Sequence, residues 1–160
     1  MKTVILFFAV FALSNCEEDG AIQFVIVDEF ETNAKVTGLK GVTTFNVTNT
    51  TDISDLLDWV DKFVDAEVEK VTLTLGDDHS TGVLAGTFVV KVGYKTLISF
   101  IGVLQKGQPK VIDVPSNAAN ILSVIQNKNL PFNFSAVLVN PGVDDDFTVN
   151  LKFKIKGTVE

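Results

Sequence analysis

The chain has 160 residues, a formal net charge of −7 and a hydrophobic fraction of 46%. This is the size of one ordinary domain, long enough to bury a full core. The acidic balance argues against a nucleic-acid partner, which would need a basic face, and against electrostatic attachment to anionic lipid. Cys16 is the only cysteine, so we expect the fold to rely on packing and not on an internal disulfide.

The first residues have the pattern of an export signal. A single basic residue, Lys2, is followed by an apolar run from Val4 to Leu13 and then by small or polar residues. The run is too short to span a bilayer, which needs roughly 20 apolar residues. The pattern predicts a signal peptide over residues 1–15, a tether over 16–20 and one domain over 21–160.

The residues around Cys16 resemble the lipobox of bacterial lipoproteins. Leu13-Ser14-Asn15-Cys16 places Leu at −3, Ser at −2 and the modified Cys at +1, while Asn15 departs from the Gly, Ala or Ser preferred at −1. In that family the Cys sulfur receives a diacylglycerol, so the resemblance implies lipid attachment at Cys16. The alternative is a plain cleaved secretory signal with an incidental cysteine.

Acidic residues follow the cysteine directly. Glu17, Glu18 and Asp19 resemble the surface-export signal of lipoproteins from the Bacteroidota. The resemblance implies an outer-membrane location, with the protein exposed at the cell surface. The alternative is that these three residues are simply a solvated tether.

The first part of the domain alternates between predicted strands and turns. Ile22 to Val27 is β-branched and aromatic, which favours a first strand. Residues 28–33 are polar and predict a turn, and residues 36–40 predict a short strand or a loop. Residues 43–48 alternate polar and apolar side chains, which is typical of a half-buried strand.

The hydrophobic period then changes to that of a helix. Thr51 or Asp52 can cap its start, and acidic residues in the first turn are favourable against the helix dipole. The helix is expected to end near Ala66, with Leu57 facing the sheet and Asp58 facing water. Its apolar stripe comprises Ile53, Leu56, Leu57, Val60 and Val64.

The chain returns to strands after this helix. Residues 68–75 have a period of two, and residues 76–82 predict a loop with glycine at each end. Two strands over residues 85–92 and 95–104 are joined by a tight turn near Gly93-Tyr94, which predicts a hairpin.

The last third predicts a short strand, a second helix and two more strands. The short strand covers residues 110–114, and Ser116 can cap the helix that follows Pro115. Strands over residues 132–139 and 147–159 close the chain, the last with near-strict alternation. The apolar face of the helix comprises Ala118, Ile121, Leu122 and Ile125.

About eight strands separated by turns predict a mainly β fold, either an antiparallel β-sandwich or an open barrel. We expect the two α-helices to cap the open ends of the core. The order of elements is similar to that of lipoproteins of flavobacterial type, and residues 51–60 running into residues 68–73 carry the likeness. The resemblance implies an outer-membrane location and a sandwich fold, and it implies no activity.

Candidate catalytic residues are few. His79, the only histidine, lies beside Asp77, Asp78 and Ser80 in a predicted loop. A nucleophilic triad needs a base that is positioned by an acid and aimed at a hydroxyl, and neighbours in sequence rarely have that geometry. No pair of carboxylates is marked out by apolar surroundings, as a glycosidase site would be. We therefore expect no enzymatic activity.

Metal ligands are also sparse. One histidine and one cysteine do not make up the three or four ligands of a zinc site. Asp144, Asp145 and Asp146 are calcium candidates because calcium takes oxygen donors, although they lack the alternating Asp-x-Asp-x-Asp-Gly spacing of a calcium loop. The alternative is that they are solvated acids of a turn. We expect no cofactor.

These observations predict a non-enzymatic, lipid-anchored extracytoplasmic protein with a binding or structural role at the outer membrane. Its partner is the membrane, through the lipid on Cys16, and nucleic acid is not a partner. One alternative is a secreted protein with a plain signal peptide that binds a sugar or a hydrophobic ligand. Another is a small surface hydrolase that uses acidic residues.

Overall fold

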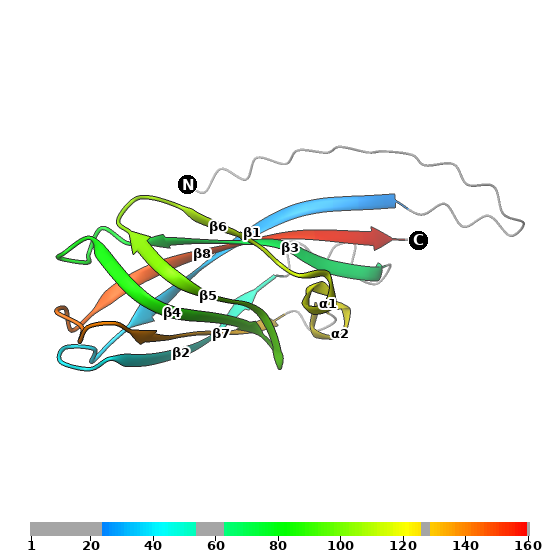
Figure 1. Cartoon of the computed structure of the whole chain (residues 1–160). Coiled ribbons are helices and arrows are strands. Elements are labelled where there is room, and N and C mark those ends of the chain that lie inside the picture. Colours follow the sequence, from blue (N-terminus) through cyan, green and yellow to red (C-terminus); the bar gives the residue numbers. More distant parts are fainter. Residues whose placement is uncertain (1–23, 54–62, 126–128, 160) are drawn as a thin grey trace, which may run out of the picture.

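The structure is a computed structural model that describes residues 24–53, 63–125 and 129–159, and these residues form a β-sandwich (Figure 1). One four-stranded sheet has the order β1-β8-β3-β6 and the other the order β2-β7-β4-β5. All neighbouring strands are antiparallel. The predicted mainly β, antiparallel sandwich is therefore confirmed. The strands are β1 (Phe24–Val36), β2 (Thr44–Asp52), β3 (Phe63–Leu75), β4 (Val83–Val92), β5 (Lys95–Gln105), β6 (Lys110–Asp113), β7 (Asn129–Leu138) and β8 (Phe147–Val159).

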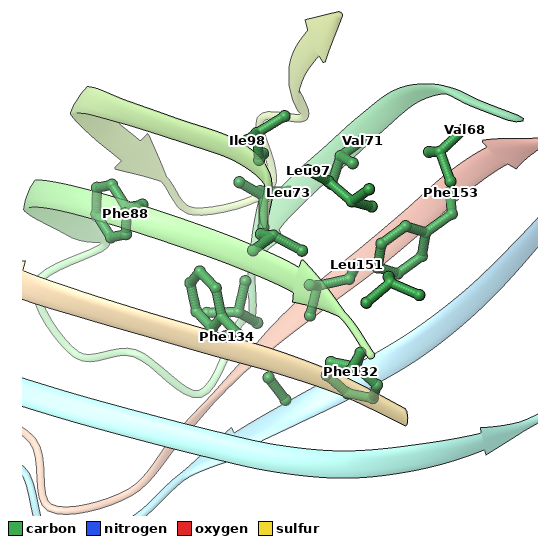
Figure 2. Close-up of a cluster of buried hydrophobic side chains, with 14 of the residues drawn as sticks. Val68, Val71, Leu73, Phe88, Leu97, Ile98, Phe132, Phe134, Leu151 and Phe153 are labelled. Carbon is green, nitrogen blue, oxygen red and sulfur yellow. The ribbon is translucent and has the colours of Figure 1, made fainter. Parts of the chain in front are cut away.

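The core lies between the two sheets and consists mainly of aliphatic and phenylalanine side chains. In Figure 2, Leu151 and Phe153 of β8 approach the core from one sheet, and Phe88 and Phe134 approach it from the other. Phe88 and Phe134 stack with ring centroids 6.2 Å apart and an interplanar angle of 5°. Because the strands alternate in and out, each sheet contributes every second residue to this layer.

The last strand behaves as its alternation predicts. Phe153 is fully buried, and Lys152 and Lys154 lie half-exposed on the outer face. β8 has a neighbour on both sides, β1 and β3, so it is internal to its sheet. The lysines therefore do not lie at a sheet edge, where they would discourage pairing with another molecule. Instead they form ion pairs with acids of the adjacent strands.

The predicted turn at residues 28–33 is wrong, because these residues continue β1 without interruption. Phe30 faces inward and stacks on Phe153 with ring centroids 4.7 Å apart. Glu29 and Glu31 face outward, where both pair with Lys152 at 3.0 and 3.2 Å. The polar residues are thus the outer face of a strand, and their charge is balanced by a lysine far away in sequence.

The first predicted helix is wrong at both ends. Thr51 and Asp52 belong to β2, and residues 63–66 begin β3, where Phe63 pairs with Val159 of β8. Val64 is 42% exposed and so lies outside the core. The middle of the predicted stripe, including Leu57, Asp58 and Val60, lies outside the described residues.

The second predicted helix is replaced by two single turns, α1 (Ser116–Ala119) and α2 (Leu122–Ile125). Asn120 between them is extended, with φ −69° and ψ 120°. The break has a tertiary cause, because the Ile121 amide donates to the Ala66 carbonyl of β3 at 2.8 Å. Pro115, and not Ser116, occupies the cap position, and no side chain caps the turn. Both turns pack at one end of the sandwich (Figure 1), so the described residues show the expected capping at that end only.

Candidate functional site

Three loops converge at the end of the sandwich opposite α1 and α2: residues 37–43, 76–82 and 139–146 (Figure 1). The first and third are joined by backbone hydrogen bonds, from the Leu39 amide to the Asp145 carbonyl at 3.1 Å and from the Gly41 amide to the Gly142 carbonyl at 2.9 Å. We call this set of loops the loop end. It contains every candidate site residue from the sequence except Cys16, which lies outside the described residues.

His79 is the buried centre of the loop end, with 2% of its surface exposed. Its Nδ1 lies 3.3 Å from the Thr81 hydroxyl and its Nε2 lies 3.6 Å from Asp144 Oδ2. The ring packs edge-on against Phe147 at the start of β8, with ring centroids 4.9 Å apart. The imidazole therefore links loop 76–82 to loop 139–146 and to the core.

Two carboxylates fix the same loops through backbone amides. Hydrogen bonding from the Ser80 side chain and from the Ser80 amide, which lies 2.8 Å from Asp144 Oδ2, lowers the pKa of Asp144 against an opposing desolvation, and nearby His79 lowers it further. Desolvation raises the pKa of Asp78, but hydrogen bonds from the Thr148 hydroxyl and amide, at 2.8 and 3.0 Å, outweigh it and lower the pKa overall. Both groups are thus held as carboxylates in the folded state.

The arrangement does not form a hydrolytic triad. His79 faces Asp144, and not its sequence neighbour Asp78, and the hydroxyl beside it belongs to Thr81 and not to Ser80. The Thr81 hydroxyl donates to the Val83 carbonyl at 3.2 Å, so its proton is directed away from the imidazole. A general base must instead accept the proton of the nucleophile. The observed contacts suit a structural link between loops.

The calcium candidates do not gather around one point. Asp144 turns towards His79 and Ser80, while Asp145 and Asp146 are exposed. In the part of the chain that the structure describes, no three His, Cys, Asp or Glu side chains form a group that could hold a metal ion.

A small cleft opens beside His79, with a volume of about 230 Å³. Thr81 and Asn140 give it a polar side, while apolar residues from β4 and the end of β7 form most of the rest. The sequence indicated His79 as a candidate, but it gave no sign of its contacts with Thr81, Asp144 and Phe147. These contacts arise because the ends of β3, β4, β7 and β8 come together in the fold.

No protein-family model and no curated protein matches the chain. Among solved structures, a turnip yellow mosaic virus structure has a TM-score of 0.44 and 12% identity, covering 87% of this chain and 95% of that one. A Desmodium yellow mottle tymovirus structure gives 0.39 and 8%, covering 92% and 94%. A structure described as Bacillus endospore appendages, a family of disulfide-linked pili, gives 0.40 and 12%, covering 92% and 98%. At these scores the likeness carries no functional argument.

Within the described residues, no helix is long and apolar enough to cross a membrane.

Acid should weaken the loop end, and we predict that Asp78 and Asp144 contribute to the loss. Their pKa values in the folded state lie below the ordinary 3.8. The stability that they contribute is therefore present above about pH 4 and is lost as the pH falls through their folded pKa values. Urea unfolding measured from pH 7 down to pH 3 should show a shallower acid decline in an Asp78→Asn, Asp144→Asn double variant than in the unmodified chain.

Asp77→Asn is the matched control for this pH dependence. It removes an exposed carboxylate from the same loop and leaves the Thr148 and Ser80 contacts in place. An acid decline that Asp77→Asn flattens as much as the double variant does would contradict the assignment.

Proposed function

We propose that the chain is a non-enzymatic, lipid-anchored extracytoplasmic protein with a binding or structural role at the outer membrane. The observation that carries the proposal is Leu13-Ser14-Asn15-Cys16 after an apolar run and before Glu17, Glu18 and Asp19. The fold is compatible with it, because the described sandwich begins at Phe24. The segment from Cys16 to Phe24 spans at most roughly 30 Å when fully extended, so an anchor on Cys16 would hold the sandwich close to the membrane.

The non-enzymatic part of the proposal is supported by the loop end. Its histidine is buried, and the neighbouring Thr81 hydroxyl is already bonded to the Val83 carbonyl. A ligand-binding protein secreted without a lipid is the second candidate, because the cleft beside His79 is lined by both polar and apolar residues. The two candidates differ in the chemical state of Cys16.

Loss of the cysteine tests the anchor. We predict that Cys16→Ala moves the protein from the membrane fraction to the soluble fraction, or blocks its processing. One acyl chain gives only marginal membrane binding, whereas two or three hold a protein durably, at about 0.8 kcal/mol per buried CH₂. Fractionation followed by immunoblotting measures the distribution, and mass spectrometry of the mature N-terminus measures acylation.

Asn15→Gly is the control, because it brings the −1 position closer to the lipobox pattern and leaves Cys16 in place. It should keep the protein in the membrane fraction. A Cys16→Ala variant that is processed normally and stays with the membrane would refute the anchor, and an unmodified Cys16 in the mature protein would favour the secreted binding protein.

A further inference from the structure

The two sheets of the sandwich present different outer faces. The outer face of the β1-β8-β3-β6 sheet is charged, and its rows are tied by ion pairs such as Lys154–Glu69 at 3.0 Å and Lys70–Asp113 at 3.5 Å. Such rows are typical of a face in contact with water. Charged residues at its outward positions include Glu29, Glu31, Lys35, Glu67, Glu69, Lys70, Asp113, Lys152, Lys154 and Lys156.

The outer face of the β2-β7-β4-β5 sheet lacks charge across its middle, and we call this region the neutral face. Ile101 on β5 is 85% exposed and Val137 on β7 is 59% exposed. Thr87 of β4 pairs with both of them and so lies between them. The outward residues of the neutral face are Thr44, Asn46, Thr48, Asn133, Ser135, Val137, Ala85, Thr87, Val89, Ser99, Ile101 and Val103.

Two of the four strands that form the neutral face, β4 and β5, carry apolar residues on both of their faces. Residues 83–90 read VLAGTFVV and residues 97–104 read LISFIGVL, whereas β8 alternates apolar residues with lysines and polar residues. A strand with one wet face alternates, while a strand covered on both faces is apolar almost throughout. β4 and β5 therefore depart from the pattern of a strand with one face in water.

The edge of the same sheet that β5 forms is also uncharged. β5 is one of the two edge strands of this sheet, and among the described strands it pairs only with β4. Its residues 96–105 carry no charge, although exposed edges normally carry charges, prolines or a short strand to prevent pairing. The other three edges have such features or are polar: β1 carries Glu29 and Glu31, β6 has four residues, and the outward side chains of β2 are Thr, Asn and Asp.

We propose that a second copy of this chain pairs with this edge, with the β5 strands of the two copies running antiparallel around a two-fold axis near Ile101. The unpaired backbone N–H and C=O groups of a free strand edge can form hydrogen bonds with the edge of another strand. A two-fold axis brings the same edge from both copies together. With a net charge of −7, two copies repel each other, and the uncharged β5 edge is where they approach with the least repulsion. The pairing joins the two β2-β7-β4-β5 sheets into one continuous sheet.

A bilayer is the weaker choice of occupant on the same observations. Surfaces that enter the membrane interface are rich in Trp, Tyr, Lys and Arg. The outward residues of the neutral face include no Trp, Tyr, Lys or Arg.

Sedimentation velocity of the full chain in a non-ionic detergent tests the proposal. The unmodified chain is expected to shift from monomer to dimer as its concentration rises. Ile101→Lys places two like charges beside each other at the axis, and the dimer should weaken by at least about tenfold. Because Ile101 is 85% exposed, the variant should unfold at the same temperature as the unmodified chain at monomeric concentrations.

Val111→Lys is the matched control, because Val111 is an exposed β-branched residue, 54% accessible, on the edge strand β6 of the charged sheet. It should leave the dimer intact. Hydrogen exchange gives an independent measure, since the amides of residues 99–103 should become protected with rising concentration in the unmodified chain and not in Ile101→Lys. A chain that stays monomeric, or a dimer that Val111→Lys weakens as much as Ile101→Lys does, overturns the proposal.

Discussion

Phe153→Asp is expected to leave the chain without a folded state. Phe153 is fully buried in the middle of β8, between Phe30 of β1 and Val71 of β3 in register. A carboxylate there would lose its hydration with no partner, and the stacking on Phe30 at 4.7 Å would be lost. The combined cost exceeds the marginal stability of an ordinary domain, about 5–15 kcal/mol, or approaches it. Circular dichroism during urea titration should show no cooperative transition.

Lys154→Thr is the control on the adjacent position of the same strand. Its ion pair with Glu69 at 3.0 Å is about one-third exposed on both sides, and such surface pairs are worth about 0–1 kcal/mol. Threonine is also favourable in a strand. The variant should unfold within about 1 kcal/mol of the unmodified chain, and the Leu151 to Ile155 amides should exchange slowly in both. A Phe153→Asp variant that still folds, together with fast exchange of the Leu151 to Ile155 amides, would mean that β8 is not part of the core.

The strands that could be predicted from the sequence are those whose period of two is local and complete. β8 and residues 71–75 of β3 alternate over their whole length, so their inward faces were evident before any contact was known. The period of two expected over residues 68–75 is broken by a register shift between Val68 and Lys70. Residues 28–33 were missed for a reason that lies elsewhere in the chain. Glu29 and Glu31 make this segment resemble a polar turn in the sequence, because the lysine that pairs with both of them, Lys152, lies far away along the chain.

The helices could not be predicted correctly because tertiary hydrogen bonds outweigh local periodicity in this chain. The apolar spacing from Ala118 to Ile125 is helical, yet the Ile121 amide bonds to β3 and divides the segment into two turns. Phe63 likewise joins a ladder with Val159, where the sequence favoured the end of a helix. Helix propensity amounts to less than about 1 kcal/mol per residue for most side chains, so a few long-range bonds can override it.

The loop end was predictable only in part. His79 stands out as the single histidine in the sequence, and the acidic turn at residues 144–146 also stands out. That the two meet depends on the order β8-β3 in one sheet and β4-β7 in the other, which places loops 76–82 and 139–146 side by side. Spacing along the chain carries no information about such a meeting.

Gly86→Ala is expected to cost about 3 kcal/mol or more, at the upper end of what overpacking costs. Gly86 lies in the middle of β4, and a Cβ atom there would overlap the Val137 carbonyl oxygen and lie 3.0 Å from Leu138 Cα. Both are backbone atoms of β7, so they can give way only if the β4–β7 ladder is disturbed. Urea unfolding should show a lower midpoint with an unchanged slope.

Gly102→Ala provides a matched control, because Gly102 is the register partner of Gly86 across β4 and β5. A Cβ atom at Gly102 would meet only the ring of Phe100, at 3.3 Å, and a side chain can shift by a few tenths of an ångström where a backbone cannot. Replacing glycine also lowers the entropy of the unfolded chain, which offsets part of the strain, so the net change should stay within about 1 kcal/mol. Equal costs for the two substitutions would mean that both positions respond only to strand propensity, and that β4 and β7 do not approach each other closely at Gly86.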